Sequence, residues 1–449
     1  MDQNKLASAK VSALLYRLAL PAICAQIVTL LYNMVDRIYI GRMEDGMLAM
    51  AGVGVCAPLL SVISALTGLF GRGGSPLAAI SMGKQNKAEA EVYLGNSFIM
   101  LLLTSVLMTL VLLLGKAPIL RLFGASDATL PFADQYLTLY CLGTVFVQLT
   151  VGMNYYITTQ GFAATAMVTT MLGGVLNIAL DPLLMFGLNM GVAGAALATV
   201  LSQFASFVWV LLFLFGRKTL LRIRLKNLRP NRAALSQMMV LGSAPCFMSA
   251  SEGLLHICFN NQALQYGGDV AVSAMTILFT MFQVVLLPIE GVAQGSQPII
   301  GYNYGTRAYG RVRETIRLAL KAATWMGVAM GCAIAAFPEP FIRLFNADPA
   351  LCGVGAPMLR LYMAGMLLHG PNATFQQTYT SLGEGRKSFF FAFLRKIVLL
   401  IPLLYLCPAI LPAWGVLSVV LAEPIADTLT TLSNALYFRR FLQKKLPME

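Results

Sequence analysis

Six of the nineteen acidic residues lie inside long apolar segments, where an ionised side chain is costly. They are Asp36, Asp181, Glu252, Glu290, Glu423 and Asp427. Such a carboxylate is by default a functional candidate, because an ion, a proton or a charged partner must offset its burial. Histidine and cysteine chemistry is sparse. There are two histidines, His256 and His369, and the eight cysteines are scattered without the spacing of a zinc site or a disulfide framework.

The first group of polar residues lies at one depth. Asp36, Asp181 and Thr199 are five to eight residues from the glycines that end their apolar segments. At ~1.5 Å per residue, this places them roughly 8–12 Å below the same membrane face. Asn177 precedes Asp181 by four and therefore shares its helix face. These oxygens suit a hard monovalent cation, with Na⁺ at Asp36 and Asp181, or an exchangeable proton. The alternative is a structural network in which Asp36 pairs with Arg37.

The second group lies in the second half of the chain. Glu252, His256 and Asn260 are spaced by four and form one stripe of a helix. Glu290 lies in the next apolar segment, and the last segment carries Glu423 and Asp427. These six residues are the predicted lining of a substrate cavity. A packing or gating role remains open for the stripe and for Glu290.

The elements that carry these residues are membrane helices. Hydrophobic residues make up 58% of the 449, charged residues only 11%, and the mean hydropathy is +0.73. Because a soluble protein carries about 25% charge, most of this chain must face lipid. A membrane-spanning helix needs ~20 or more residues, so a chain of this length can form about twelve of them with short connections. We expect helices at 14–40, 47–80, 92–114, 131–159, 163–187, 191–215, 236–265, 270–303, 312–337, 350–381, 388–410 and 413–440.

The two halves of the chain repeat each other. The segment PILRLFGASD at 118–127 recurs as PFIRLFNADP at 340–349, and MGVAGAALA at 190–198 recurs as WGVLSVVLA at 414–422. Six spans per half is an even number, which predicts a parallel repeat. We therefore expect an all-α membrane protein with two six-helix lobes. The expected division is 1–215, a basic cytoplasmic linker at 216–235, and 236–449.

The net charge of +13 is explained by membrane topology. With the N-terminus inside, 25 Lys and Arg residues fall in inside segments and four in outside segments. This count assigns Arg395 and Lys396 to the inside. The excess predicts that both termini are cytoplasmic, and it argues against a nucleic-acid partner.

The sequence resembles the multidrug and toxic compound extrusion (MATE) family of bacterial antiporters. The likeness rests on LPAICAQIVTLLYNMVDRIYIGR at 20–42, NIALDPLLMFGLNMGVAGAALATVLSQ at 177–203, GSQPIIGYNYG at 295–305 and LGEGRKS at 382–388. It implies two bundles that alternate between outward- and inward-facing states. It also implies a first-lobe cation site of Asp36, Asn154, Asn177, Asp181 and Thr199. Many members carry acids in helices 7 and 10, but here the tenth span has no carboxylate, so a second-lobe ion site of that type is not expected.

The sequence thus predicts a multidrug efflux antiporter of the bacterial inner membrane, working by alternating access. It would export cationic or amphipathic compounds in exchange for H⁺ or Na⁺, as a monomer and without another cofactor. The alternative is a flippase for a lipid-linked saccharide, from the same broader superfamily. A membrane enzyme is disfavoured, because the longest loop is a basic linker without catalytic clusters.

Overall fold

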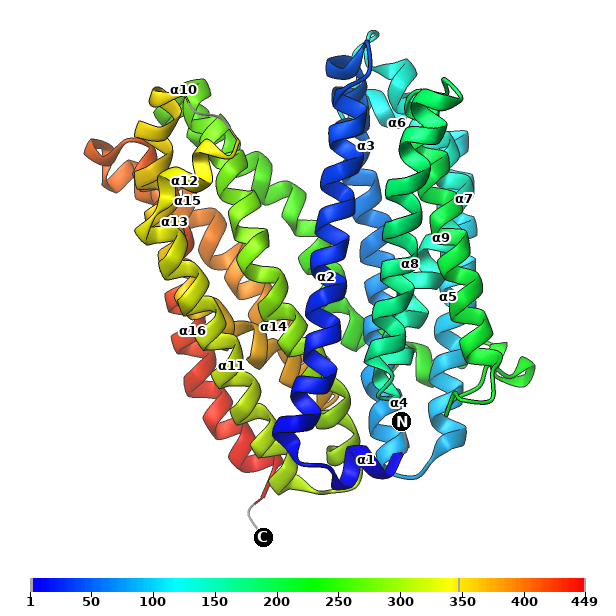
Figure 1. Ribbon diagram of the computed structural model, residues 1–449. Helices are drawn as coiled ribbons and strands as arrows, with labels where there is room; N and C mark the ends of the chain where they lie inside the picture. The colour runs from blue at the N-terminus through cyan, green and yellow to red at the C-terminus, as the bar shows by residue number, and fades with distance from the viewer. Residues whose placement is uncertain (1–2, 346–347, 448–449) are drawn as a thin grey trace. The chain divides into compact units, whose positions relative to one another are not determined.

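The computed structural model describes residues 3–345 and 348–447, and in these ranges the regular secondary structure is entirely helical. Figure 1 shows long helices joined by short connections. The first half of the chain contains α1 (Gln3–Ser8), α2 (Val11–Gly41), α3 (Gly46–Thr67), the π-helical η1 (Gly68–Arg72), α4 (Gly73–Gly83), α5 (Lys87–Leu114), α6 (Lys116–Leu122), α7 (Leu130–Thr159), α8 (Ala163–Pro182), the π-helical η2 (Leu183–Gly187) and α9 (Val192–Phe215).

The second half begins after the linker. It contains the 3₁₀ turn η3 (Leu225–Leu228), α10 (Arg232–Gly305), α11 (Tyr309–Ala336), α12 (Pro338–Arg343), α13 (Pro349–Ser381), α14 (Gly385–Phe393), the π-helical η4 (Leu394–Leu400), α15 (Ile401–Ile410), the 3₁₀ turn η5 (Pro412–Trp414) and α16 (Val416–Lys445).

Eleven helices in the described ranges are long and apolar enough to cross a membrane. One of them, α10, has 74 residues and is interrupted at Gly268, whose φ is 65°. At ~1.5 Å per residue such a helix measures about 110 Å, which is enough for two crossings. Counting α10 twice gives the twelve crossings predicted from the sequence.

The lipid-facing character of these helices is visible on α5. Leu103, Leu107, Leu110 and Leu114 are each half or more exposed. Their spacing of three and four residues puts them on one helix face. A row of exposed leucines would be unfavourable in water but is what a lipid-facing helix presents.

The two halves share local geometry, which confirms the repeat. Gly161 and Gly383, 222 residues apart, both adopt positive φ, and so do Gly191 and Gly415, 224 residues apart. Helix pairing repeats as well: α7 packs against α5 and α9, and α13 packs against α11 and α16. Equivalent sequence segments therefore form equivalent turns and helix contacts.

The chain forms two compact units that exchange segments. The first contains the described residues up to Ser8 together with Cys24–Ser249, and the second contains Ala9–Ile23 and the described residues from Ala250 onward. Helix α2 is thus divided between the units, as is α10. The division expected from the sequence differs, because its linker at 216–235 leaves α2 wholly in the first half and the spans of α10 wholly in the second. That division stays a prediction.

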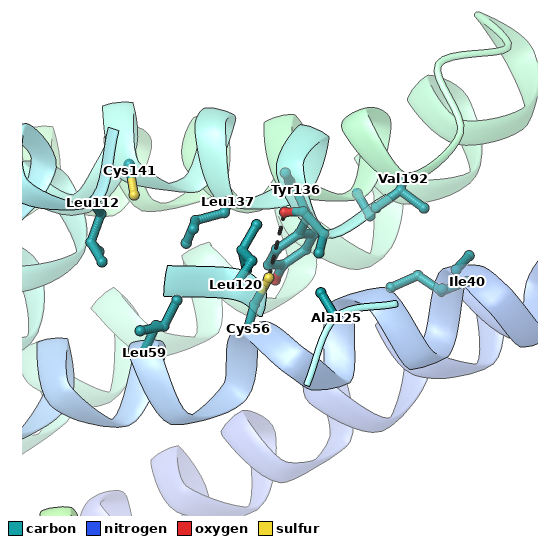
Figure 2. Packing of buried hydrophobic residues seen from close by; sticks show 14 of the residues in the cluster. Ile40, Cys56, Leu59, Leu112, Leu120, Ala125, Tyr136, Leu137, Cys141 and Val192 are labelled. Carbon is teal, nitrogen blue, oxygen red and sulfur yellow. Dashed lines mark hydrogen bonds between the residues drawn. The ribbon is translucent and has the colours of Figure 1, made fainter. Parts of the chain in front are cut away.

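The core of the first unit packs around α7. Figure 2 shows Ile40, Cys56, Leu59, Leu120 and Tyr136 among its side chains. They come from α2, α3, α6 and α7. A weak hydrogen bond from the Cys56 thiol to the Ala133 carbonyl, 3.5 Å long, ties α3 to α7. The same core includes Val192 and Ala195 of α9, so it positions α2 and α9, the helices that carry Asp36 and Thr199.

Candidate ion and substrate sites

Three π-helical stretches lie beside charged residues inside the spans. η1 ends at Arg72, η2 directly follows Asp181 and Pro182, and η4 contains Arg395 and Lys396. Proline has no amide hydrogen, so the α-helical pattern of α8 ends there and continues as a wider turn. Such widened turns are frequent at functional sites, because they change how side chains and carbonyls are presented.

Asn177, Asp181 and Thr199 form one buried cluster in the first unit. The Asn177 amide nitrogen Nδ2 lies 3.3 Å from Oδ1 of Asp181 and 3.4 Å from Oγ1 of Thr199. Asp181 is fully buried, and Asn177 is 3% exposed. The four-residue spacing on α8 and the contact between α8 and α9 bring these groups together.

Asp36 on α2 belongs to the same neighbourhood. Its carboxylate interacts electrostatically with Asp181, and the buried Tyr136 on α7 interacts with both acids. Oδ1 of Asp36, Oδ2 of Asp181 and Oδ1 of Asn177 are buried without a hydrogen-bond partner among the described residues. Buried acceptors are normally paired, so three unpaired acceptors in one cluster mark a place for a cation or a proton.

Asn154 lies apart from these residues. Its Nδ2 donates to the carbonyl of Ala166 at 3.0 Å. Ala166 precedes Asn177 by eleven residues, about 16 Å along α8 at the helical rise. Of the five residues that the family likeness suggests, the structure brings four together and separates Asn154. Tyr136 joins them instead, and sequence spacing gave no sign of it.

The second unit holds a buried ion-pair network. Arg395 donates from Nε to Oδ1 of Asp427 at 2.5 Å and from Nη2 to Oε1 of Glu423 at 2.6 Å. All three side chains are at most 10% exposed. His369 Nδ1 lies 4.0 Å from Oδ2 of Asp427, too far for a hydrogen bond. Arg395 therefore pairs with both acids, but its single positive charge balances only one of their two negative charges. Oδ2 of Asp427 is buried without a hydrogen-bond partner among the described residues.

Lys396, the next residue, faces other acids. Its Nζ lies 3.8 Å from Oε1 of Glu252, and it interacts electrostatically with Glu290 and Glu423. The Lys396 side chain is 4% exposed, whereas that of Glu252 is 50% exposed. Arg395 and Lys396 therefore lie buried within the span Gly385–Ile410. Their assignment to an inside segment was wrong, and the inside count falls to 23.

An aromatic group adjoins these charges. His256 stacks on Phe279 with ring centroids 4.2 Å apart, and Tyr362 makes edge contacts with Phe279 and Phe282 at 6.4 and 5.8 Å. Tyr362 also interacts electrostatically with Glu252 and Glu423. Rings beside carboxylates are the surroundings that organic cations prefer.

Asn260 follows Glu252 and His256 on the same helix stripe, but its side-chain oxygen has no partner of the kinds described for those two residues. Its Oδ1 is buried without a hydrogen-bond partner in the described ranges. The second unit thus offers an unpaired amide oxygen near the charged and aromatic residues of α10. In the described ranges, no three His, Cys, Asp or Glu side chains are grouped so that they could hold a metal ion.

Twelve crossings arranged as two repeated units, each with charged groups buried inside its spans, define a multi-pass membrane transporter. The MatE family model matches residues 21–183 and again residues 245–406. The chain therefore belongs to the MATE family of transporters, which are not enzymes. The two matches start 224 residues apart, in agreement with the repeat.

Individual relatives and solved structures are consistent with membership of the MATE family. The chain is similar to the multidrug export protein MepA of Staphylococcus aureus strain MRSA252, at 25% identity over 418 residues, covering 93% of this chain and 91% of MepA. It is also similar to a crystal structure of MATE in the straight conformation, with a TM-score of 0.93, 25% identity and 99% coverage of both chains. An outward-facing MATE transporter of the MOP superfamily matches with a TM-score of 0.93 and 24% identity, over 100% of this chain and 99% of that one.

Proposed function

We propose that the chain is a secondary-active antiporter that exports cationic or amphipathic drugs, coupled to inward movement of H⁺ or Na⁺. The observation that carries this proposal is the set of unpaired acceptor oxygens on Asp36, Asn177 and Asp181. Membership of the MATE family and the similarity to proteins named multidrug export proteins support it.

The coupling step takes place at Asp36 and Asp181. A proton that binds there cancels one negative charge, and it gives an unpaired oxygen a donor function. A sodium ion instead accepts electron pairs from the carboxylates, the Asn177 amide and the Thr199 hydroxyl. Either ion relieves the cost of burying two neighbouring carboxylates, so occupancy changes the stability of the surrounding helix packing.

Substrate binding is assigned to Glu252, Glu290 and the aromatic group of the second unit. Glu252 is half exposed and its contact with Lys396 is long, at 3.8 Å. An arriving cation would replace Lys396 as the partner of Glu252, with His256 and Tyr362 providing ring contacts. Glu423 and Asp427 are assigned a structural role, because Arg395 binds one carboxylate oxygen of each.

Transport then requires that ion and drug differ in their affinity for two conformations. Helix α2 carries Asp36 in the first unit and continues into the second, so it is our candidate for the element that couples the two units. The corrected charge count of 23 inside and four outside still predicts cytoplasmic termini in a bacterial inner membrane.

One observation supports the alternative, a flippase for a lipid-linked saccharide. Arg395 and Lys396 are buried bases, and bases of this kind could bind the anionic pyrophosphate of such a cargo. Both nevertheless interact with acids, and the four acids around them, which are Glu252, Glu290, Glu423 and Asp427, outnumber these two bases. The balance of charge favours a cationic substrate.

The test is dye efflux from proteoliposomes under an imposed pH gradient or an imposed sodium gradient. We expect one gradient to drive efflux by the wild type, and Asp36→Asn and Asp181→Asn to abolish it. Asp45→Asn is the matched control, because Asp45 is an exposed loop residue that undergoes the same chemical change. Normal gradient-driven efflux by both site variants would refute the coupling site.

A further inference from the structure

The basic linker between the halves is fixed to the first unit. Gln160, at the end of α7 and 1% exposed, uses its side-chain oxygen to accept three hydrogen bonds from the linker. The donors are the Thr219 hydroxyl and the amides of Leu220 and Leu221, at 2.9, 2.7 and 2.9 Å. A buried acceptor with three donors holds the start of the linker in one conformation.

Two further buried side chains of α5 hold the rest of the linker. Glu91 accepts a charged hydrogen bond from Arg224 at 2.6 Å, and its exposure is 2%. Asn96 accepts from the amide of Asn231 at 2.7 Å and donates to the carbonyl of Asn227 at 3.3 Å. The linker is therefore a preformed surface of the first unit.

A cavity of about 670 Å³ lies between the linker and the starts of α5 and α10. Its lining includes Lys87, Arg224 and Lys226 together with Glu89 and Glu91. Arg224 and Glu91 neutralise each other, which leaves two lysines against one acid. The cavity is thus positive, and it adjoins a linker segment that contains seven Lys and Arg residues and no acidic residue.

The side chain of Asn227 indicates that a ligand of this cavity would accept hydrogen bonds. It lines the cavity, is 8% exposed, and its Nδ2 is buried with no hydrogen-bond partner among the described residues. A buried amide donor without a partner is energetically costly. A phosphate oxygen would satisfy it, and the two lysines would balance the phosphate charge.

The turn η3, which contains Asn227, also carries an exposed apolar side chain. Leu225, between Arg224 and Lys226 on η3, is 87% exposed. Basic residues interleaved with an exposed leucine are typical of a segment at the boundary between headgroups and acyl chains. A soluble anion would use the lysines but would leave Leu225 in water.

We propose that this cavity binds the headgroup of an anionic phospholipid from the adjacent leaflet. Lys87 and Lys226 pair with the phosphate, the Asn227 amide donates to it, and Leu225 contacts the acyl chains. The proposal does not depend on the antiport mechanism. It uses the proposed orientation only to assign the leaflet as cytoplasmic.

The experiment measures lipid binding rather than transport. Purified protein is placed in nanodiscs of phosphatidylcholine with increasing phosphatidylglycerol, and bound phosphatidylglycerol is counted by native mass spectrometry after release. The test variant is Lys87→Gln with Lys226→Gln. The control is Lys84→Gln with Arg229→Gln, which removes the same charge from exposed residues outside the cavity.

Each lysine that contacts the headgroup should contribute about fivefold in affinity, so the test variant should bind about 30-fold more weakly. The control should keep most of the wild-type affinity. Both test lysines are exposed, so folding is retained, and circular dichroism checks it. Equal binding by test and control variants would overturn the proposal. So would displacement of the lipid by millimolar inorganic phosphate, which would make the cavity a site for a soluble anion.

Discussion

The role of Arg395 can be tested by removing it. Arg395→Met keeps a side chain of similar length but leaves Glu423 and Asp427 without the guanidinium that holds them at 2.6 and 2.5 Å. Both carboxylates are buried, so water cannot replace the lost partner. Breaking a buried ion pair from one side costs about 3–5 kcal/mol. Protonation of one carboxylate would recover part of that cost.

The assay is thermal unfolding of purified protein in one detergent, followed by tryptophan fluorescence and by loss of the monodisperse peak. The matched control is Arg386→Met. Arg386 lies nine residues earlier on α14 and is exposed, so its replacement should change stability by less than about 0.5 kcal/mol. We expect a clear fall in midpoint temperature for Arg395→Met and none for the control.

A rescue variant separates charge from packing. Arg395→Met combined with Glu423→Gln and Asp427→Asn removes all three charges, and neutral replacement of a buried ion network is often close to neutral in stability. Most of the lost stability should return. If Arg395→Met is as stable as Arg386→Met, or if the triple variant is no better than the single one, the structural assignment of these acids is wrong.

Three other substitutions test other parts of the structure. Lys396→Met should tighten binding of a monocationic dye roughly tenfold, because Glu252 loses its internal competitor. Fluorescence polarisation measures this, and unchanged affinity would contradict the displacement step. Gly295→Ala should destabilise the protein by about 1–3 kcal/mol, because the added Cβ would lie 2.6 Å from backbone atoms of α2. Gly253→Ala on the same helix is the control, because an added Cβ there has no atom within 4 Å. Equal thermal stability of the two alanine variants would refute that packing. Glu384→Gln should cost about 1 kcal/mol or less at pH 7. Burial raises the pKa of this loop carboxyl, but hydrogen bonds from two lysines outweigh burial and hold the pKa below 4.5. The stabilisation is therefore present above pH 4.5 and is lost as pH falls through the lower folded pKa. A wild-type advantage that persists unchanged in acid would contradict it.

The spans were predictable because hydropathy is a local property. The predicted segments 47–80 and 163–187 correspond to Gly46–Gly83 and Ala163–Gly187 in the structure. Glycine and proline marked most boundaries, and the loss of apolar character marked the rest. The four-residue spacing of Asn177 and Asp181 likewise predicted that they share a face, since one helix fixes that relation.

The second-unit network was not predictable in the same way. Arg395 meets acids that follow it by 28 and 32 residues on another helix, so no local pattern records the pairing. A base near the end of a span ordinarily reaches the aqueous interface, so its burial in an ion-pair network is not apparent from the sequence. Tyr136 escaped prediction for a related reason, because buried tyrosines are common and only helix packing shows which one meets an acid pair.

Helix α2 makes close packing contacts in both units. In the first unit, Val28 of α2 lies against Gly174 of α8, where an added Cβ would come within 2.9 Å of it. In the second unit, Ala19 lies against Gly295 of α10 at 2.6 Å by the same measure. Each half of α2 therefore fits closely onto a glycine of a different unit. Under the proposed antiport mechanism, a change of charge at Asp36 would act on a helix that packs closely in both units, so we propose α2 as the element that carries the signal.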